Sequence, residues 1–402
     1  KSTSIARYLN VRQAYGPTIS SDGKQLAFLT DITGMPQVWQ VPLTGEPGII
    51  LWPEQLTFET DRIMQAQFSP AEDGRLLYMR DTGGNEKQQL FLLSEDGSPE
   101  INLTRGFEDV THSFGAWAKD GSAVYFAANR RNPALFDFYK QSLDGEAILV
   151  WQNDTPGYLT NVDIAPDGQR AVVVRTSSSF SHTLLEIDLT SGTARQWLAS
   201  DEAVRFTAAH YAADGRALYL ITDLDADFLY IARLDLDTGT PERLVAPKWD
   251  CDGMALAPDG HSLAYIVNVE GAHHLHLYDL ATGATRTAPD IAELAGVIRG
   301  DRPIFSPDGQ RIAFAFTSAT RAADIYVWDL IEDTVYPVTR SSHGGLATKD
   351  FVAPELIRYP TFDAFADGTP RTIPAWFFKP PDKSNEPLPA VVVVHGGPEG
   401  QF

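Results

Sequence analysis

The chain has 402 residues, 43% of them hydrophobic, and its 32 basic and 53 acidic side chains give a net charge of −21 at pH 7. This charge argues against nucleic acids and anionic membranes as partners, because both attract positive charge. The single cysteine, Cys251, excludes an internal disulfide, and no segment approaches the roughly 20 apolar residues of a membrane span. Because the first residues also lack the apolar core of a secretion signal, a cytoplasmic location is predicted.

The first 14 residues precede any regular pattern. Ile5, Tyr8 and Leu9 have the spacing of one helix face, so a short helical segment is predicted within residues 1–14.

A repeat then runs from residue 15 to residue 340. An Asp-Gly pair followed by a short polar step and an apolar segment occurs seven times, with the aspartates at Asp22, Asp73, Asp120, Asp167, Asp214, Asp259 and Asp308. Successive aspartates are 51, 47, 47, 47, 45 and 49 residues apart. The aspartate can cap backbone N–H groups and the glycine tolerates positive φ, so each pair predicts a tight turn.

Each repeat contains further apolar segments, which give four strands per repeat. In the last repeat, Ile312, Phe314 and Phe316 alternate with small residues and predict a strand with one buried face. A period of roughly 40–50 residues with four strands is typical of a β-propeller. The sequence therefore predicts an all-β fold with a seven-bladed propeller.

The order of strands predicts how the ring closes. A strand at residues 17–19 already precedes the first Asp-Gly turn, and the last repeat has its own fourth strand near Val338. No blade then needs a strand from the other end of the chain. We expect four-stranded blades without strand exchange and a ring closed by packing of the first blade against the seventh.

Charged residues at two kinds of position are candidates for substrate binding. Glu86 lies in an unusual Gly-Gly-Asn hairpin of the second blade, residues 81–88, although an ordinary turn would have the same composition. Four arginines lead into first strands near one rim of the ring and could meet a peptide carboxylate: Arg62, Arg205, Arg299 and Arg302. The alternative is that these arginines pair with neighbouring acidic side chains.

The histidines at positions 273, 274 and 276 do not predict a metal site. His274 and His276 share one face of a strand, but no third ligand is suitably spaced, so an ordinary surface strand is expected. No metal and no cofactor are predicted.

The repeat ends after Thr339, and the composition changes. Residues 341–352 read as a linker and residues 353–402 as the start of a second domain. Within it, Ala390–Val394 is a continuous apolar run that predicts a strand buried on both faces. Because the sequence stops shortly after this run, we expect the chain to be part of a longer polypeptide.

The repeats and the segments after them resemble the prolyl oligopeptidase family of serine peptidases, with the acylaminoacyl-peptidase-like enzymes as the most similar branch. The segments outside the repeats that support the resemblance are Glu355–Pro360, Ile373–Trp376 and the His-Gly-Gly-Pro sequence from His395 to Pro398. The resemblance implies that residues 353–402 begin an α/β-hydrolase domain. It also implies that the propeller restricts access to short peptides and that a Ser-Asp-His triad cleaves them.

The resemblance further implies that the backbone N–H of Gly397 stabilises the oxyanion of the reaction. No Gly-x-Ser-x-Gly in a strand-turn-helix context occurs, so the triad would lie beyond Phe402 and the chain alone should be inactive. The implied partners are short peptides and the remainder of the hydrolase domain, and a homo-oligomer is compatible with the sequence. Two alternatives stay open: a non-catalytic binding propeller and a propeller-capped esterase.

Overall fold

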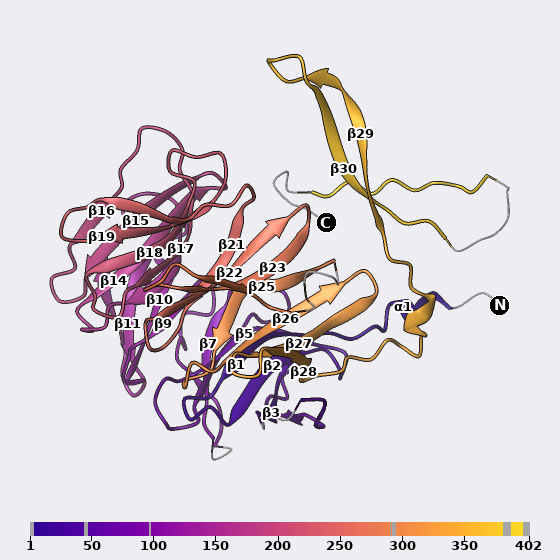
Figure 1. The fold of residues 1–402 in the computed structure, drawn as a ribbon. Helices are drawn as coiled ribbons and strands as arrows, with labels where there is room; N and C mark the ends of the chain where they lie inside the picture. Colours follow the sequence, from indigo (N-terminus) through magenta and orange to yellow (C-terminus); the bar gives the residue numbers. More distant parts are fainter. Residues whose placement is uncertain are drawn as a thin grey trace.

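The computed structural model describes residues 4–43, 47–95, 98–289, 291, 295–380 and 387–396. Seven four-stranded antiparallel sheets follow one another along the chain and stand as blades around a ring (Figure 1). The prediction of a seven-bladed propeller is confirmed. The helices of the described residues are α1 (Ile5–Tyr8) and a 3₁₀ helix, η2 (Thr348–Asp350). No helix among these residues is long and apolar enough to cross a membrane.

The strands of each blade are consecutive in sequence. Blade one consists of β1 (Ala14–Ile19), β2 (Gln25–Thr30), β3 (Gln37–Pro42) and β4 (Glu54–Gln55), and blade two of β5 (Ile63–Phe68), β6 (Leu76–Arg80), β7 (Gln89–Leu93) and β8 (Ile101–Asn102). Blade three consists of β9 (His112–Trp117), β10 (Ala123–Asn132), β11 (Leu135–Ser142) and β12 (Ala147–Trp151), and blade four of β13 (Tyr158–Ile164), β14 (Arg170–Ser178), β15 (Ser181–Asp188) and β16 (Ala194–Trp197). Blade five consists of β17 (Phe206–Tyr211), β18 (Ala217–Thr222), β19 (Tyr230–Asp235) and β20 (Pro241–Val245), and blade six of β21 (Cys251–Leu256), β22 (Ser262–Val269), β23 (Ala272–Asp279) and β24 (Thr285–Thr287). Blade seven consists of β25 (Gly296–Phe305), β26 (Arg311–Ser318), β27 (Arg321–Asp329) and β28 (Thr334–Pro337).

The Asp-Gly pairs form the turns between the first and second strands. In blade seven, Gly309 has a φ of 69° and donates its N–H to the Ser306 carbonyl at 2.8 Å. The Asp308 carboxylate accepts the Gln310 N–H at 3.0 Å. The aspartate therefore caps the turn and the glycine supplies the left-handed backbone, as the sequence predicts.

The second strands are buried on both faces, which differs from the expectation of one buried face. On β26, Ile312, Phe314 and Phe316 pack toward blade six, while Ala313 and Ala315 pack toward blade one. The difference arises because each blade lies between two others, so that even the small alternating residues are covered. The hydrophobic core is therefore distributed between neighbouring blades.

The ring closes by contacts between side chains of the first and seventh blades. Ala14, Leu26 and Phe28 of blade one share a buried cluster with Ile325 and Val327 of blade seven. Among the described residues, no strand of blade one joins the sheet of blade seven. The prediction of closure without strand exchange is confirmed.

The segments before and after the propeller meet at one side of the ring. Val11 forms an isolated antiparallel bridge with His343, and Arg12 donates its N–H to the Ser342 carbonyl at 2.7 Å. A two-stranded sheet of β29 (Glu355–Ala364) and β30 (Pro370–Phe377) then projects from the ring, drawn in yellow in Figure 1.

One sequence prediction outside the propeller is wrong. The apolar run Ala390–Val394 forms no strand, and its valines are exposed, with 86% exposure for Val391 and 82% for Val394. A strand buried on both faces needs hydrogen-bonding neighbours and covering helices, and none of the described residues provides them.

Candidate functional site

The first strands of the blades surround the centre of the ring. Each forms one edge of its sheet, and neighbouring first strands contact one another, for example β1 with β5 and β17 with β21. The Asp-Gly turns lie where these strands end, and we call that side of the propeller the Asp-Gly face. The first strands begin on the other side of the propeller. We call that side the hairpin face, because the turn from β22 to β23 contacts the β29–β30 hairpin there.

Arg299 contacts Tyr15 at the seam between blades one and seven, and Arg62 interacts electrostatically with the same tyrosine. The Arg299 guanidinium lies 4.2 Å from the centre of the Tyr15 ring and also donates to the Gln13 side chain. Burial raises the pKa of Tyr15, while Arg299 and the more distant Arg62 lower it. The structure therefore brings together Arg62 and Arg299, which are far apart in sequence, on the hairpin face.

Arg205 has a different environment. Its Nε lies 2.6 Å from the Asp223 carboxylate, and its backbone N–H donates to the same carboxylate at 2.7 Å. A second carboxylate, that of Asp250, is 3.9 Å away. Arg205 therefore pairs with neighbouring acidic side chains, which is the alternative to substrate binding that the sequence left open.

Arg302 lies farther along β25 than Arg299 and faces side chains of other blades. The register of β25 against β26 shifts between Arg299 and Ile304, so the backbone of this segment departs from a regular strand. Electrostatic interactions link Arg302 to Asp163 of blade four and to His210 of blade five. Arg302 is thus separated from the other three candidate arginines.

Asp163 connects three blades. It accepts a hydrogen bond from Lys119 Nζ at 3.2 Å and from the Tyr211 backbone N–H at 2.9 Å. His210 Nδ1 lies 3.9 Å from the same carboxylate. Together with Arg302, these side chains form a cluster at the centre of the ring, which we call the axial cluster: Lys119, Asp163, His210 and Arg302.

The electrostatics of the axial cluster favour an anion. Burial lowers the pKa of His210 to about 4, with Arg302 adding to this effect and Asp163 opposing it, so the imidazole is neutral at pH 7. Desolvation lowers the pKa of Arg302, although solvent still reaches its side chain. Within the described part of the chain, Arg302 forms no hydrogen bond and no ion pair closer than 4 Å. The charges of Lys119 and Asp163 offset each other, so with Arg302 the axial cluster has a net positive charge.

Glu86 occupies a fixed position on the hairpin face. Its backbone has a φ of 61°, and its N–H donates to the buried Asp81 carboxylate at 2.9 Å. Gly83 and Gly84 also have positive φ values, 62° and 74°, so this segment forms a tight loop between β6 and β7. The Glu86 side chain is exposed. The remaining candidate, Gly397, lies outside the described residues.

Sequence reasoning missed three members of the axial cluster, Lys119, Asp163 and His210. A signal for two of them exists, because Asp163 and His210 each stand four residues before the aspartate of their Asp-Gly turn. The equivalent residue of blade one, Thr18, accepts the Phe68 N–H at 3.1 Å across the blade boundary, just as Asp163 accepts that of Tyr211. Alignment of the repeats on their turns would have singled out this position.

His273 also differs from the expectation of a surface strand. It is buried, its Nδ1 accepts the Ile298 N–H at 2.9 Å, and its Nε2 lies 3.2 Å from Asp252. The histidine therefore links blades six and seven. His274 and His276 lie with their ring centres 6.3 Å apart, and His276 stacks on Tyr265.

Known proteins resemble this chain over almost its whole length. No protein-family model matches the chain. The dipeptidyl aminopeptidase BIII of Pseudoxanthomonas mexicana is 22% identical over 400 residues, which cover 94% of this chain and 54% of the relative. The chain thus spans about half the length of the curated relative that it matches.

Solved structures share the fold. Puromycin hydrolase superposes with a TM-score of 0.76 at 17% identity, over 96% of this chain and 62% of that protein. A structure from a study of two prolyl endopeptidases superposes with a TM-score of 0.67 at 17% identity, over 91% of this chain and 54% of that protein. The chain is therefore similar in sequence to a dipeptidyl aminopeptidase, and it shares its fold with the matching parts of a puromycin hydrolase and a prolyl endopeptidase.

Proposed function

We propose that this chain is the substrate-restricting part of a serine peptidase that hydrolyses short peptides, with a Ser-Asp-His triad supplied by residues outside the chain. The observation that most supports this proposal is the arrangement of the hairpin face. There the β29–β30 hairpin stands on blade six through the Arg358–Glu270 ion pair, on the side of the ring where Arg62 and Arg299 lie. A catalytic domain continuing from this hairpin would face the charged centre of the ring.

The charged residues of the ring suit the termini of a short peptide. A carboxylate bound by arginine gains charge-assisted hydrogen bonds, and a terminal ammonium would be attracted by the exposed carboxylate of Glu86. Arg62, Arg299 and Arg302 are the proposed carboxylate contacts, and Arg205 is the weakest candidate because two carboxylates already surround it. The backbone N–H of Gly397 is the proposed hydrogen-bond donor to the oxyanion of the reaction. A backbone amide can fill this role only if its loop comes close to the reacting carbonyl group.

The substrate class is proposed from the relatives. The matched proteins are named as a dipeptidyl aminopeptidase, a puromycin hydrolase and prolyl endopeptidases. The sequence motifs resemble those of acylaminoacyl peptidases. We therefore propose hydrolysis of short peptides at an amide bond near one terminus, with blocked and free amino termini as the two cases to compare.

The longer protein that contains this chain provides the test. We expect it to react covalently with a serine-directed fluorophosphonate probe and to cleave acyl-peptide or dipeptidyl amide substrates faster than simple esters of similar size. Absence of labelling together with absence of peptide hydrolysis would overturn the peptidase proposal and favour a binding propeller. Labelling with hydrolysis of esters alone would favour the propeller-capped esterase.

We also propose a cytoplasmic location. Its support is the single cysteine, Cys251, which is buried and free, as expected of a protein that does not depend on disulfides. Fractionation of cells with an antibody against the propeller is the test, and recovery outside the cytoplasmic fraction would contradict it.

A further inference from the structure

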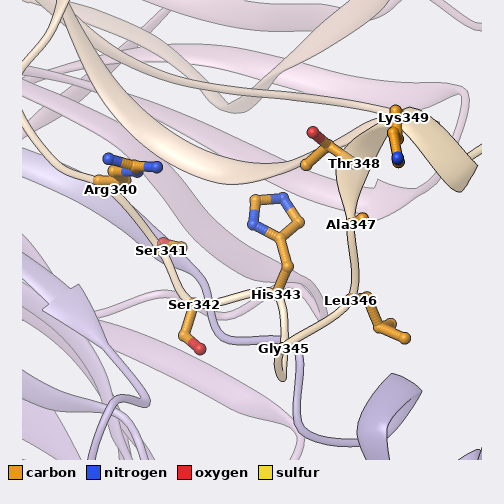
Figure 2. Close-up of a pocket in the computed structure, with 9 residues that line it drawn as sticks. All are labelled: Arg340, Ser341, Ser342, His343, Gly345, Leu346, Ala347, Thr348 and Lys349. Atoms are coloured by element: carbon orange, nitrogen blue, oxygen red, sulfur yellow. The ribbon is translucent and has the colours of Figure 1, made fainter.

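A pocket of about 570 Å³ lies where the chain leaves blade seven, in the segment from Arg340 to Lys349. We call it the linker pocket. Figure 2 shows His343 between the Arg340–Ser342 segment and the Ala347–Lys349 segment, with Arg340 and Lys349 at opposite ends of the view. None of its lining residues is a member of the axial cluster or one of the arginines near Tyr15.

The polar side chains that line the linker pocket are cationic, hydroxylic or, for His343, an imidazole. Arg340 and Lys349 supply two positive charges, Ser342 and Thr348 supply hydroxyl groups, and no lining residue is acidic. The Ser341 hydroxyl also lines the pocket, but it is within 2.9 Å of both the Ala323 carbonyl and the Asp324 carboxylate, to which it donates. This composition is unusual in a chain with a net charge of −21. A local excess of positive charge with hydroxyl donors favours an anionic ligand.

The two nearby carboxylates do not neutralise these cations. Asp350 follows Lys349 but does not line the pocket. Asp324 is buried, and one of its oxygens accepts hydrogen bonds from Thr339 Oγ1 at 2.8 Å and from the Ser341 N–H at 2.7 Å. Among the residues that the structure describes, neither Arg340 nor Lys349 forms a hydrogen bond or an ion pair.

The walls of the linker pocket are held by contacts with other segments. His343 Nε2 accepts the Ala322 N–H of β27 at 3.4 Å, and the ring lies 5.8 Å from that of Phe351. In the neutral imidazole the proton is then on Nδ1, which is free to act as a donor. Arg7 of α1 donates to the Gly344 carbonyl at 2.9 Å, in a turn where Gly344 has a φ of 63°. The pocket is therefore largely formed before any ligand binds.

We propose that the linker pocket binds the phosphate group of a small phosphorylated molecule. A phosphate dianion carries two negative charges, which match the two positive charges of Arg340 and Lys349, whereas a single carboxylate balances only one of them. The planar guanidinium of Arg340 suits two phosphate oxygens, and the His343 N–H and the hydroxyls of Ser342 and Thr348 can donate to the others. Because residues of α1 and blade seven hold the pocket walls in place, a bound phosphate would stabilise the linker against the propeller.

Isothermal titration calorimetry of the 402-residue chain with inorganic phosphate and with glycerol phosphate, each against sodium acetate at equal ionic strength, tests the proposal. We expect saturable binding of one or both phosphates, and binding weakened about tenfold by R340Q and by K349Q, since each removes one charge-assisted contact. The matched control is K248Q, which removes an exposed lysine from a loop of the propeller. Stronger binding of glycerol phosphate would identify an organic phosphate as the ligand. Stronger binding of inorganic phosphate would identify the free ion.

Hydrogen exchange provides a second readout. Phosphate should slow amide exchange in residues 340–349 of the unchanged chain and of K248Q, but much less in R340Q. Both substituted side chains are exposed, so the thermal unfolding midpoint without phosphate should not change. The proposal is overturned if the unchanged chain shows no saturable phosphate binding, if acetate binds as tightly, or if K248Q weakens binding as much as R340Q.

Discussion

The indole of Trp376 packs directly on Gly271, at a separation where a Cβ on the glycine would lie only 3.3 Å from the ring. Gly271 belongs to the two-residue turn between β22 and β23, and the other turn residue, Glu270, pairs with Arg358 of β29. The contact between the propeller and the β29–β30 hairpin thus includes a position that is suited to glycine for two reasons, its φ of 88° and the closeness of the indole.

Gly271→Ala should destabilise the protein by about 1–2 kcal/mol, because alanine is strained at positive φ, and should also displace Trp376. Faster amide hydrogen exchange in β29 and β30 is the expected sign of the displaced hairpin. The matched control is Gly34→Ala in the blade-one turn, where φ is 104° and nothing lies within 4 Å of the added Cβ. Equal exchange rates in the hairpin of both variants would show that the indole contact does not hold it.

The seam between blades one and seven should matter as much as any other blade boundary. Ile325 is fully buried in the cluster that joins these blades, and Ile231 is fully buried between blades five and six. Ile325→Ala and Ile231→Ala should each lower the free energy of unfolding by about 2–5 kcal/mol, as the lost contacts leave a cavity. Urea denaturation measures both. A much smaller loss for Ile325→Ala would mean that ring closure depends little on this packing.

Acid should destabilise the fold between pH 6.5 and about 4. Burial is the main cause that lowers the pKa of His112, His210 and His276 to about 4, against 6.5 for the free side chain. In this window the unfolded chain binds protons that the folded chain does not, so stability is fully present above pH 6.5 and is lost as the pH falls. The slope is at most about 1.4 kcal/mol per pH unit for each histidine.

Urea denaturation at a series of pH values checks this prediction, with His276→Gln as the comparison. Removing one such histidine should reduce the number of protons that the chain takes up on unfolding in this pH window by about one. An unfolding free energy that stays constant from pH 6.5 to pH 4.5 would show that these histidines protonate in the folded protein.

Two substitutions in the axial cluster should move the pKa of His210 in opposite directions. Arg302→Gln should raise it, because Arg302 disfavours the imidazolium, and Asp163→Asn should lower it further, because Asp163 favours it. Nuclear magnetic resonance titration of ¹⁵N-labelled histidines measures both shifts. Arg205→Gln, which changes an arginine already paired with Asp223, should leave His210 unchanged. No shift in the Arg302 variant would mean that the two side chains do not face each other.

Much of the propeller could be predicted because its information is local. Asp308 and Gly309 determine their turn through hydrogen bonds within a few residues, and this pattern recurs at nearly constant spacing. The same locality predicted closure without strand exchange, since each blade has four strands of its own. Whether Ala390–Val394 forms a strand is not a local property, because such a strand depends on neighbours that the run itself does not contain.

The candidate arginines show the same division. The sequence identified Arg62, Arg205, Arg299 and Arg302 as residues that lead into first strands, but it could not distinguish them. The structure places Arg299 and Arg302 within β25 itself. The structure separates them: Arg205 pairs with Asp223, Arg299 stacks on Tyr15, and Arg302 faces the axial cluster. These partners come from other strands and other blades.

The sequence by itself thus determined the number of blades, their turns and the manner of closure, because turn formation and strand periodicity depend on residues close together in the chain. Only the tertiary structure decided which charges meet. Asp163, His210 and Arg302 are separated by tens of residues or more, and closing the ring brings them to one axis, where distance and burial set their charge states. The linker pocket likewise exists only because α1 and blade seven hold the segment around His343 in place.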